Sequence, residues 1–326
     1  MSDTARPRFA RWMAWVLWGA LGLALGPAHA AGTEPAASSA KSAMAYRYWD
    51  WGATPKRDDY QFALLTLALD KTAKDYGPYQ LARVVRSYST SRLRREINRG
   101  DVVNVHAGPW RPLELSEDKL PERSLRVSIS ILKDLLGYRR LLIRREDLAR
   151  FKRIRHADDL KQLVVGQAAG WVDVEIYRHN GYQVNDIANP ATLFDMLAKK
   201  RFDYIPISLM EAETALDSRP DLAGELMLLP DITIYFPLPI IFYVNIHEPQ
   251  MAERLEAGLN QAKQDGSFER LFRSHFAHEL QLIRDGSAKR FMLNNPFVPI
   301  ELATEKSLEA AEPSIQAASA AKGRGR

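Results

Sequence analysis

The sequence predicts an α/β protein built of two lobes that two crossover strands connect. Strand and helix patterns alternate through the body of the chain, about residues 44–300. Segments 92–106 and 194–208 both run from an amphipathic helix, through a basic helix end, to an Asp that opens an apolar strand. Two further apolar strand patterns, at 135–145 and 236–245, lie on either side of the second of these units. We therefore expect one such unit in each lobe and a crossover at each strand.

Residues 1–30 have the pattern of a secretory signal peptide. Arg6, Arg8 and Arg11 precede an apolar stretch at 12–25, and the segment closes with Ala-His-Ala. A membrane span takes ~20 apolar residues, and this run is shorter. We expect cleavage directly after the Ala-His-Ala end; an uncleaved anchor is the alternative.

The remaining composition limits the compartment and the partners. The chain contains no cysteine, which excludes disulfides, thiol chemistry and the lipid-bearing cysteine of a lipoprotein. The formal net charge of +5 is spread over both signs, whereas a nucleic-acid interface needs a concentrated basic face. Residues 31–43 and 301–326 are low-complexity segments, expected to be a flexible linker and a disordered tail. We expect a periplasmic monomer that binds no nucleic acid.

The first lobe is expected to comprise 44–137 plus 245–300. Its predicted strands are 46–49, 81–85 and 102–106, and its predicted helices are 58–73, 89–98, 247–263 and 267–276. The second lobe is expected at 138–244, with a hinge strand at each end. Its predicted strands are 163–166, 183–185 and 202–207, and its predicted helices are 172–179, 191–200 and 209–216. Asp101 and Asp203 are expected to be turn residues that open their strands.

The return strand at 236–245 reads "FPLPIIFYVN". Pro237 and Pro239 cannot donate ladder hydrogen bonds, so they must lie ahead of the paired region or on an edge. The run from Ile240 to Val244 has no polar alternation, which is typical of a strand buried on both faces of a parallel sheet. Two crossovers make a hinge, and a cleft at a hinge is a preferred place for a small ligand.

Several segments, taken in order, resemble the family 3 periplasmic solute-binding proteins that serve amino-acid ABC transporters. They are "LLGYRRLLI", "VVGQAAGWVDVEIYRHNGY", "LFDMLAKKRFDYIPIS", "FPLPIIFYVN", "DGSFERLFRSHF" and "NNPFVP", and the likeness covers roughly residues 46–299. "DGSFERLFRSHF" is the most telling piece, since it resembles the family's C-terminal helix pair. The resemblance implies the type II periplasmic binding fold, with a ligand gripped between strand-to-helix loops of both lobes.

The chain departs from the family pattern at the ligand groups. Amino-acid binders of the family commonly hold the ligand ammonium with a carboxylate after the second lobe's last parallel strand. Ser208 stands there in this chain, with Glu211 one turn further on. Arg111 is available for a ligand carboxylate, but the usual Thr/Ser-rich approach is absent. The resemblance therefore leaves the identity of the ligand open.

Loops at the carboxyl ends of strands supply the candidate site residues. The candidates are Asp50, Trp51, Trp110, Arg111, Gly170, Trp171, Asp173, Ser208 and Glu211. Aromatic faces can stack a planar or cationic ligand, and an arginine can clamp a carboxylate. As alternatives, the tryptophans only close the lobe edges, and Asp173 only complements a helix dipole. Arg139 and Arg140 of the outgoing strand are expected to be structural.

Signs of an enzyme are few. His275, His278 and Glu279 are spaced to share a metal on a helix, but no His-Glu-x-x-His motif or third placed ligand accompanies them. We expect no cofactor, no metal and no catalysis, and a solute-binding protein for an ABC-type permease. The alternatives are a ligand-sensing module for a membrane signalling protein, and a cleft enzyme such as a cyclohexadienyl-type dehydratase. In the enzyme, Glu211 or Asp173 would be the acid or base.

Overall fold

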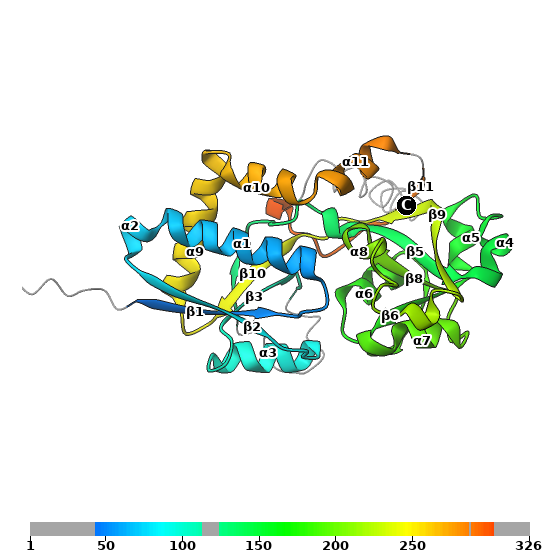
Figure 1. Cartoon of the computed structure of the whole chain (residues 1–326), viewed down its shortest axis with the longest axis horizontal. Coiled ribbons are helices and arrows are strands. Elements are labelled where there is room, and N and C mark those ends of the chain that lie inside the picture. Colours follow the sequence, from blue (N-terminus) through cyan, green and yellow to red (C-terminus); the bar gives the residue numbers. More distant parts are fainter. Residues whose placement is uncertain (1–42, 113–123, 287, 303–326) are drawn as a thin grey trace, which may run out of the picture. The chain divides into compact units, whose positions relative to one another are not determined.

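A computed structural model describes residues 43–112, 124–286 and 288–302 (Figure 1). The described residues belong to one compact unit. The predicted leader, most of the predicted linker and nearly all of the predicted tail lie outside the described residues. In the part of the chain that the structure describes, no helix is both long enough and apolar enough to span a bilayer.

Strands of the first sheet lie in the order β2-β1-β3-β10-β4. Their bounds are β1 Met44–Asp50, β2 Tyr79–Val85, β3 Val105–Pro109, β4 Ser124–Val127 and β10 Ile240–Asn245. β1 is parallel to both β2 and β3, so these three strands end at the same edge of the sheet. β10 is buried along its whole length, as expected, but it runs antiparallel to β3 and β4. The expectation of parallel pairing for this strand is wrong.

Helices from two distant parts of the chain surround the first sheet, some against its strands and some against other helices. They are α1 (Pro55–Lys71), α2 (Ala73–Tyr76), α3 (Thr90–Arg99), α9 (Pro249–Gln264) and α10 (Ser267–His275). α1 buries Leu64, Leu65 and Ala68 on one face, as helical spacing of apolar residues requires. α9 crosses α1 at Gly258, where a Cβ atom would lie 2.0 Å from the carbonyl oxygen of Ala68. The lack of a side chain on Gly258 therefore sets how closely these two helices approach.

The second sheet has the order β11-β9-β5-β8-β6-β7. Its strands are β5 Tyr138–Arg144, β6 Val164–Ala168, β7 Gln183–Ala188, β8 Tyr204–Ser208, β9 Leu226–Tyr235 and β11 Lys289–Met292. The helices of this part are α4 (Leu148–Phe151), α5 (Ala157–Lys161), α6 (Val172–His179), α7 (Leu193–Ala198) and α8 (Leu209–Ala212), and α11 (Ala277–Asp285) leads into β11. Two α/β lobes with one sheet each confirm the predicted fold class.

The chain passes between the sheets where β4 leads to β5 and where β9 leads to β10. The two passages are in contact, because the Phe236 amide donates to the Gly137 carbonyl at 3.3 Å and the Ile131 amide donates to the Ile240 carbonyl at 2.8 Å. β10 itself belongs to the first sheet, so the chain returns to the first lobe before β10 and not after it, where the boundary was expected. A third passage was not predicted: β11 pairs in parallel with β9, although residues 245–300 were expected in the first lobe.

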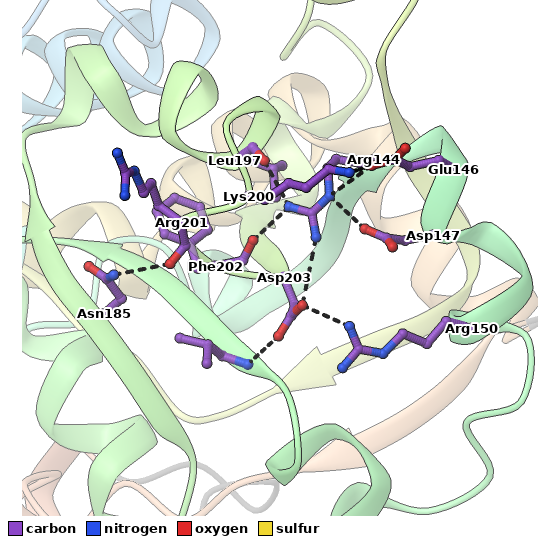
Figure 2. A network of polar contacts seen from close by, with 11 residues as sticks. Arg144, Glu146, Asp147, Arg150, Asn185, Leu197, Lys200, Arg201, Phe202 and Asp203 are labelled. Atoms are coloured by element: carbon purple, nitrogen blue, oxygen red, sulfur yellow. Dashed lines mark hydrogen bonds and ion pairs between the residues drawn. The ribbon is translucent and has the colours of Figure 1, made fainter.

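Asp203 organises the turn before β8 (Figure 2). Its carboxylate accepts a hydrogen bond from the Val164 amide at 2.8 Å and pairs with Arg150 at 2.8 Å. Buried Arg144 approaches the same carboxylate at 3.6 Å and donates to the carbonyls of Leu197 and Phe202 at 2.7 Å. The predicted role of Asp203 as a structural turn residue is confirmed, and the network extends well beyond the turn.

Candidate functional site

The loops that follow the parallel strands carry the candidate residues. Asp50 is the last residue of β1, and Arg111 lies two residues after β3. In the second sheet β6 and β8 are parallel, so Gly170 after β6 and Ser208 at the end of β8 belong to the same edge. The carboxyl edge of parallel strands is the usual binding edge of open α/β sheets. The structure links these two edges through two direct side-chain contacts.

The first link is made by Arg111. Its Nη1 atom donates to the carbonyl oxygen of Gly170 at 2.8 Å. Arg126 of β4 holds the segment that carries Arg111. Its guanidinium donates to the Arg111 carbonyl at 2.8 Å and lies 4.5 Å from the Trp110 ring centroid. Trp110 also packs against Tyr243 of β10 and its apolar neighbours. Arg111 and Gly170 are therefore brought together, while Trp110 serves partly to close the edge of its lobe.

The second link is an ion pair between Arg57 of α1 and Glu211 of α8. Arg57 Nη1 lies 2.9 Å from Glu211 Oε1, and Arg57 Nη2 donates to Thr54 Oγ1 at 2.9 Å. Both charged side chains are largely buried, at 15% and 26% exposure. The sequence analysis missed Arg57. One signal was available, because a cation in the first turn of a helix is disfavoured by the helix dipole and so calls for a partner elsewhere.

The other second-lobe candidates have partners inside the protein. Asp173 and Arg139 form an ion pair at 2.7 Å, with both side chains almost fully buried. The expected structural role of Arg139 agrees with this contact. Ser208 is fully buried, and its hydroxyl accepts a hydrogen bond from the Met210 amide at 3.3 Å as the N-cap of α8. Trp171 is half-buried at the start of α6 and packs on the apolar cluster of the second lobe.

Asp50 is 1% exposed and also has internal partners. Its carboxylate accepts from the Gly52 amide at 2.6 Å and is ion-paired with Arg83, which also contacts Asp59. Asp50 thus fixes the loop rather than reaching out of it. Trp51, the next residue, is half-buried.

Asp58 is a further carboxylate near these loops that the sequence analysis read only as part of a helix. It lies 4% exposed in the first turn of α1, where it accepts a hydrogen bond from the Thr54 amide at 3.2 Å. Desolvation by burial raises the pKa of Asp58 to about 6, with Arg57 opposing the shift and Asp50 adding to it. A carboxyl group with a pKa near 6 can exchange a proton close to neutral pH.

The suggested metal-ligand group on the C-terminal helices has other partners. His278 lies 3.0 Å from Glu213, Glu279 pairs with Lys56, and the ring of His275 packs edge-on against Tyr60 at 5.5 Å. Among residues 43–112, 124–286 and 288–302, no three His, Cys, Asp or Glu side chains are grouped so as to hold a metal ion.

Comparisons with known proteins show the fold. No protein-family model matches the chain, and no curated protein matches it. Among solved structures, a periplasmic His/Glu/Gln/Arg/opine family-binding protein from Silicibacter pomeroyi in complex with lysine is similar, with a TM-score of 0.50 and 11% identity over 72% of this chain and 97% of that one. An ancestral arginine-binding protein bound to glutamine has a TM-score of 0.50 and 15% identity, over 71% and 97% of the two chains. The chain has the two-lobed fold of these binding proteins.

Proposed function

We propose that the protein is a solute-binding protein, which captures a small polar solute between the strand-end loops of its two lobes. The proposed solute is an amino acid or a related organic acid or amine. The observation that carries the proposal is the pair of direct links at those loops, Arg111 to Gly170 and Arg57 to Glu211. Both similar structures bind an amino acid, lysine in one and glutamine in the other, which supports the solute class.

Lobe closure is the proposed mechanism. A ligand that contacts both lobes stabilises the closed arrangement by its differential affinity for it. Arg111 would supply donors from the first lobe and the Gly170–Trp171 turn would supply the wall of the second. Near the end of β8, the carboxylate available to a ligand ammonium would be Glu211, which is 26% exposed and would have to be shared with Arg57. Binding of an α-amino acid would therefore exchange one protein ion pair for a ligand ion pair.

The proposed location is the periplasm, since the predicted leader directs export and a lipid-bearing cysteine is absent. The proposed partner is an inner-membrane ABC permease that recognises the closed form. A membrane sensor that reads the same closed form is the alternative partner. Pull-down of membrane proteins by the ligand-loaded protein, compared with the empty protein, distinguishes the two by the identity of what binds.

A thermal-shift screen of the chain from Ala31 onward tests the solute-binding proposal. The compounds are amino acids, polyamines, organic acids and aromatic acids. A ligand at a hundred times its dissociation constant adds ~2.7 kcal/mol to the free energy of unfolding, which raises the melting temperature. Arg111→Gln should abolish the shift given by a hit, whereas Arg99→Gln, on the exposed end of α3, should keep it. If no compound shifts the melting temperature, or if Arg111→Gln keeps the full shift, the proposal fails.

A second candidate function is an enzyme in the same cleft, and Asp58 favours it. Its pKa of about 6 and its contact with the Thr54 loop suit a general acid or base better than Asp173 or Glu211, which are both held by arginines. Incubating each hit with the protein and analysing the mixture by mass spectrometry separates the two functions. A hit that is consumed, with Asp58→Asn binding it but not consuming it, would replace binding by catalysis.

A further inference from the structure

A hollow in the second lobe, away from the strand-end loops, has the features of a separate ligand site. It encloses about 300 Å3 and lies between the end of α4, the middle of β9 and the start of β11. This volume is at the lower end of the range for small-molecule sites, roughly 300–1,000 Å3. The hollow therefore has room for a compact ligand and not for a large one.

A bulge in β9 creates the hollow. Arg140 pairs with Thr233, but the next residue of β5, Leu141, pairs with Leu229. Pro230, Asp231 and Ile232 are thus left out of the ladder with β5. Pro230 cannot donate a ladder hydrogen bond, which suits a position outside the pairing. Bulges often occur beside binding sites, because they redirect side chains.

The floor of the hollow is apolar and its rim is basic. Phe151, Ile154, Leu229 and Ile232 are each at most 5% exposed and form the floor. Lys152, Arg155 and Lys289 lie exposed on the rim together with a single carboxylate, Asp231. Positive charge therefore exceeds negative charge by two at the rim.

Two of the three rim cations contact backbone carbonyls, and the Asp159 carboxylate, which accepts from the Arg155 amide at 2.7 Å, offsets part of the charge of Arg155. Lys289 Nζ donates to the Ile154 carbonyl at 3.2 Å, and Arg155 Nη1 donates to the Lys152 carbonyl at 2.9 Å. Within the described ranges, none of the rim cations forms an ion pair with a carboxylate, whereas Arg150 of the same lobe lies 2.8 Å from a carboxylate oxygen of Asp203. Carbonyl contacts orient a cation but leave its charge available to an anion.

We propose that this hollow is a second binding site, for a small organic dianion such as a four-carbon dicarboxylate. Two negative charges match the excess positive charge of the rim, and a short hydrocarbon body matches the apolar floor. Lys289 belongs to β11, the strand that returns to this lobe from the C-terminal helices. A bound dianion would therefore tie β11 to the α4 end of the lobe.

Titration of the purified protein with succinate, followed by backbone amide NMR at constant ionic strength, tests the proposal. Succinamide is the neutral control of the same size, and acetate is the monovalent control. We expect saturable shifts of the amides of residues 151–155, Leu229, Asp231 and Ile232, weaker binding of acetate and no binding of succinamide. Shifts confined to residues 50–58 and 170–173 would place succinate at the strand-end loops and overturn the second site. Equal affinity for succinate and acetate would overturn the dianion.

Variants of opposite sign check the same site. Lys289→Gln should weaken succinate binding by about two- to fivefold, the range for exposed charge pairs, and Lys289→Arg should restore it. Asp231→Asn should strengthen binding by a similar factor, because it removes the carboxylate that lines the rim. Lys74→Gln, an exposed lysine of α2, should leave the affinity unchanged. Loss of affinity in Asp231→Asn, or no change in Lys289→Gln, would contradict the assignment.

Discussion

Replacing Gly137 with alanine tests the contact between the two main passages of the chain. A Cβ atom built on Gly137 lies 1.9 Å from the Phe236 carbonyl oxygen, and ordinary contact begins at 3.4 Å. The passages must therefore separate by about 1.5 Å. The hydrogen bond from the Phe236 amide to the Gly137 carbonyl, already 3.3 Å long, would be lost. Gly137 does not use the left-handed conformation, so the cost of the alanine is steric.

The expected loss has two parts. Overpacking costs about 1–3 kcal/mol, and the lost hydrogen bond costs about 1 kcal/mol more. We expect Gly137→Ala to lower the free energy of unfolding by about 2–4 kcal/mol in urea denaturation followed by tryptophan fluorescence. Gly224→Ala is the matched control, because no atom lies within 4 Å of its Cβ position and its change should stay within about 0.5 kcal/mol. Equal unfolding midpoints for Gly137→Ala and the wild type would show that the passages do not touch as described.

Three further predictions concern charges. Burial raises the folded-state pKa of Asp58 to about 6 from 3.8, so folding favours the protonated carboxyl. The contribution of this carboxyl to the free energy of unfolding is fully present below pH 3.8 and is lost as the pH rises through 6. The stability difference between Asp58→Asn and the wild type should therefore grow by about 2 kcal/mol between pH 4 and pH 7, and a difference independent of pH would contradict the shift. Arg144→Met should cost about 3–5 kcal/mol in urea denaturation, because it removes the buried guanidinium that bonds the Leu197 and Phe202 carbonyls and lies beside Asp203. A loss below about 1 kcal/mol would mean that these contacts are not needed. Glu211→Gln should remove the Arg57 ion pair and reduce ligand-induced compaction in small-angle scattering; unchanged compaction would show that this pair takes no part in closure.

Local patterns in the sequence predicted most of the helices and strands, because apolar spacing and turn residues can be recognised from neighbouring positions alone. The apolar run Ile240–Val244 identified a strand buried on both faces, yet burial does not encode direction, and β10 pairs antiparallel. β11 was missed because "KRFM" is a short edge strand, with two basic residues followed by two apolar ones and no periodic signal. The strand 102–106 was placed early, since Val102 and Val103 are apolar but β3 begins at Val105. Its start depends on pairing partners that lie far away in the sequence.

For the candidate site too, the sequence predicted where residues lie along the strands but not which residues they contact. The rule that ligands meet the carboxyl ends of parallel strands selected Arg111 and Gly170, and the structure brings these two residues into hydrogen-bond contact. The rule could not say that Asp173 is paired with Arg139, or Glu211 with Arg57, because these partners come from other elements of the fold. The family that the sequence resembles commonly has a carboxylate at the end of β8; here Ser208 stands there, and Glu211, one helical turn later, contacts the first lobe directly. The Glu211 carboxylate thus takes part in a side-chain contact between the lobes, as Arg111 does, and in the proposed binding mode a ligand ammonium would have to compete with Arg57 for it.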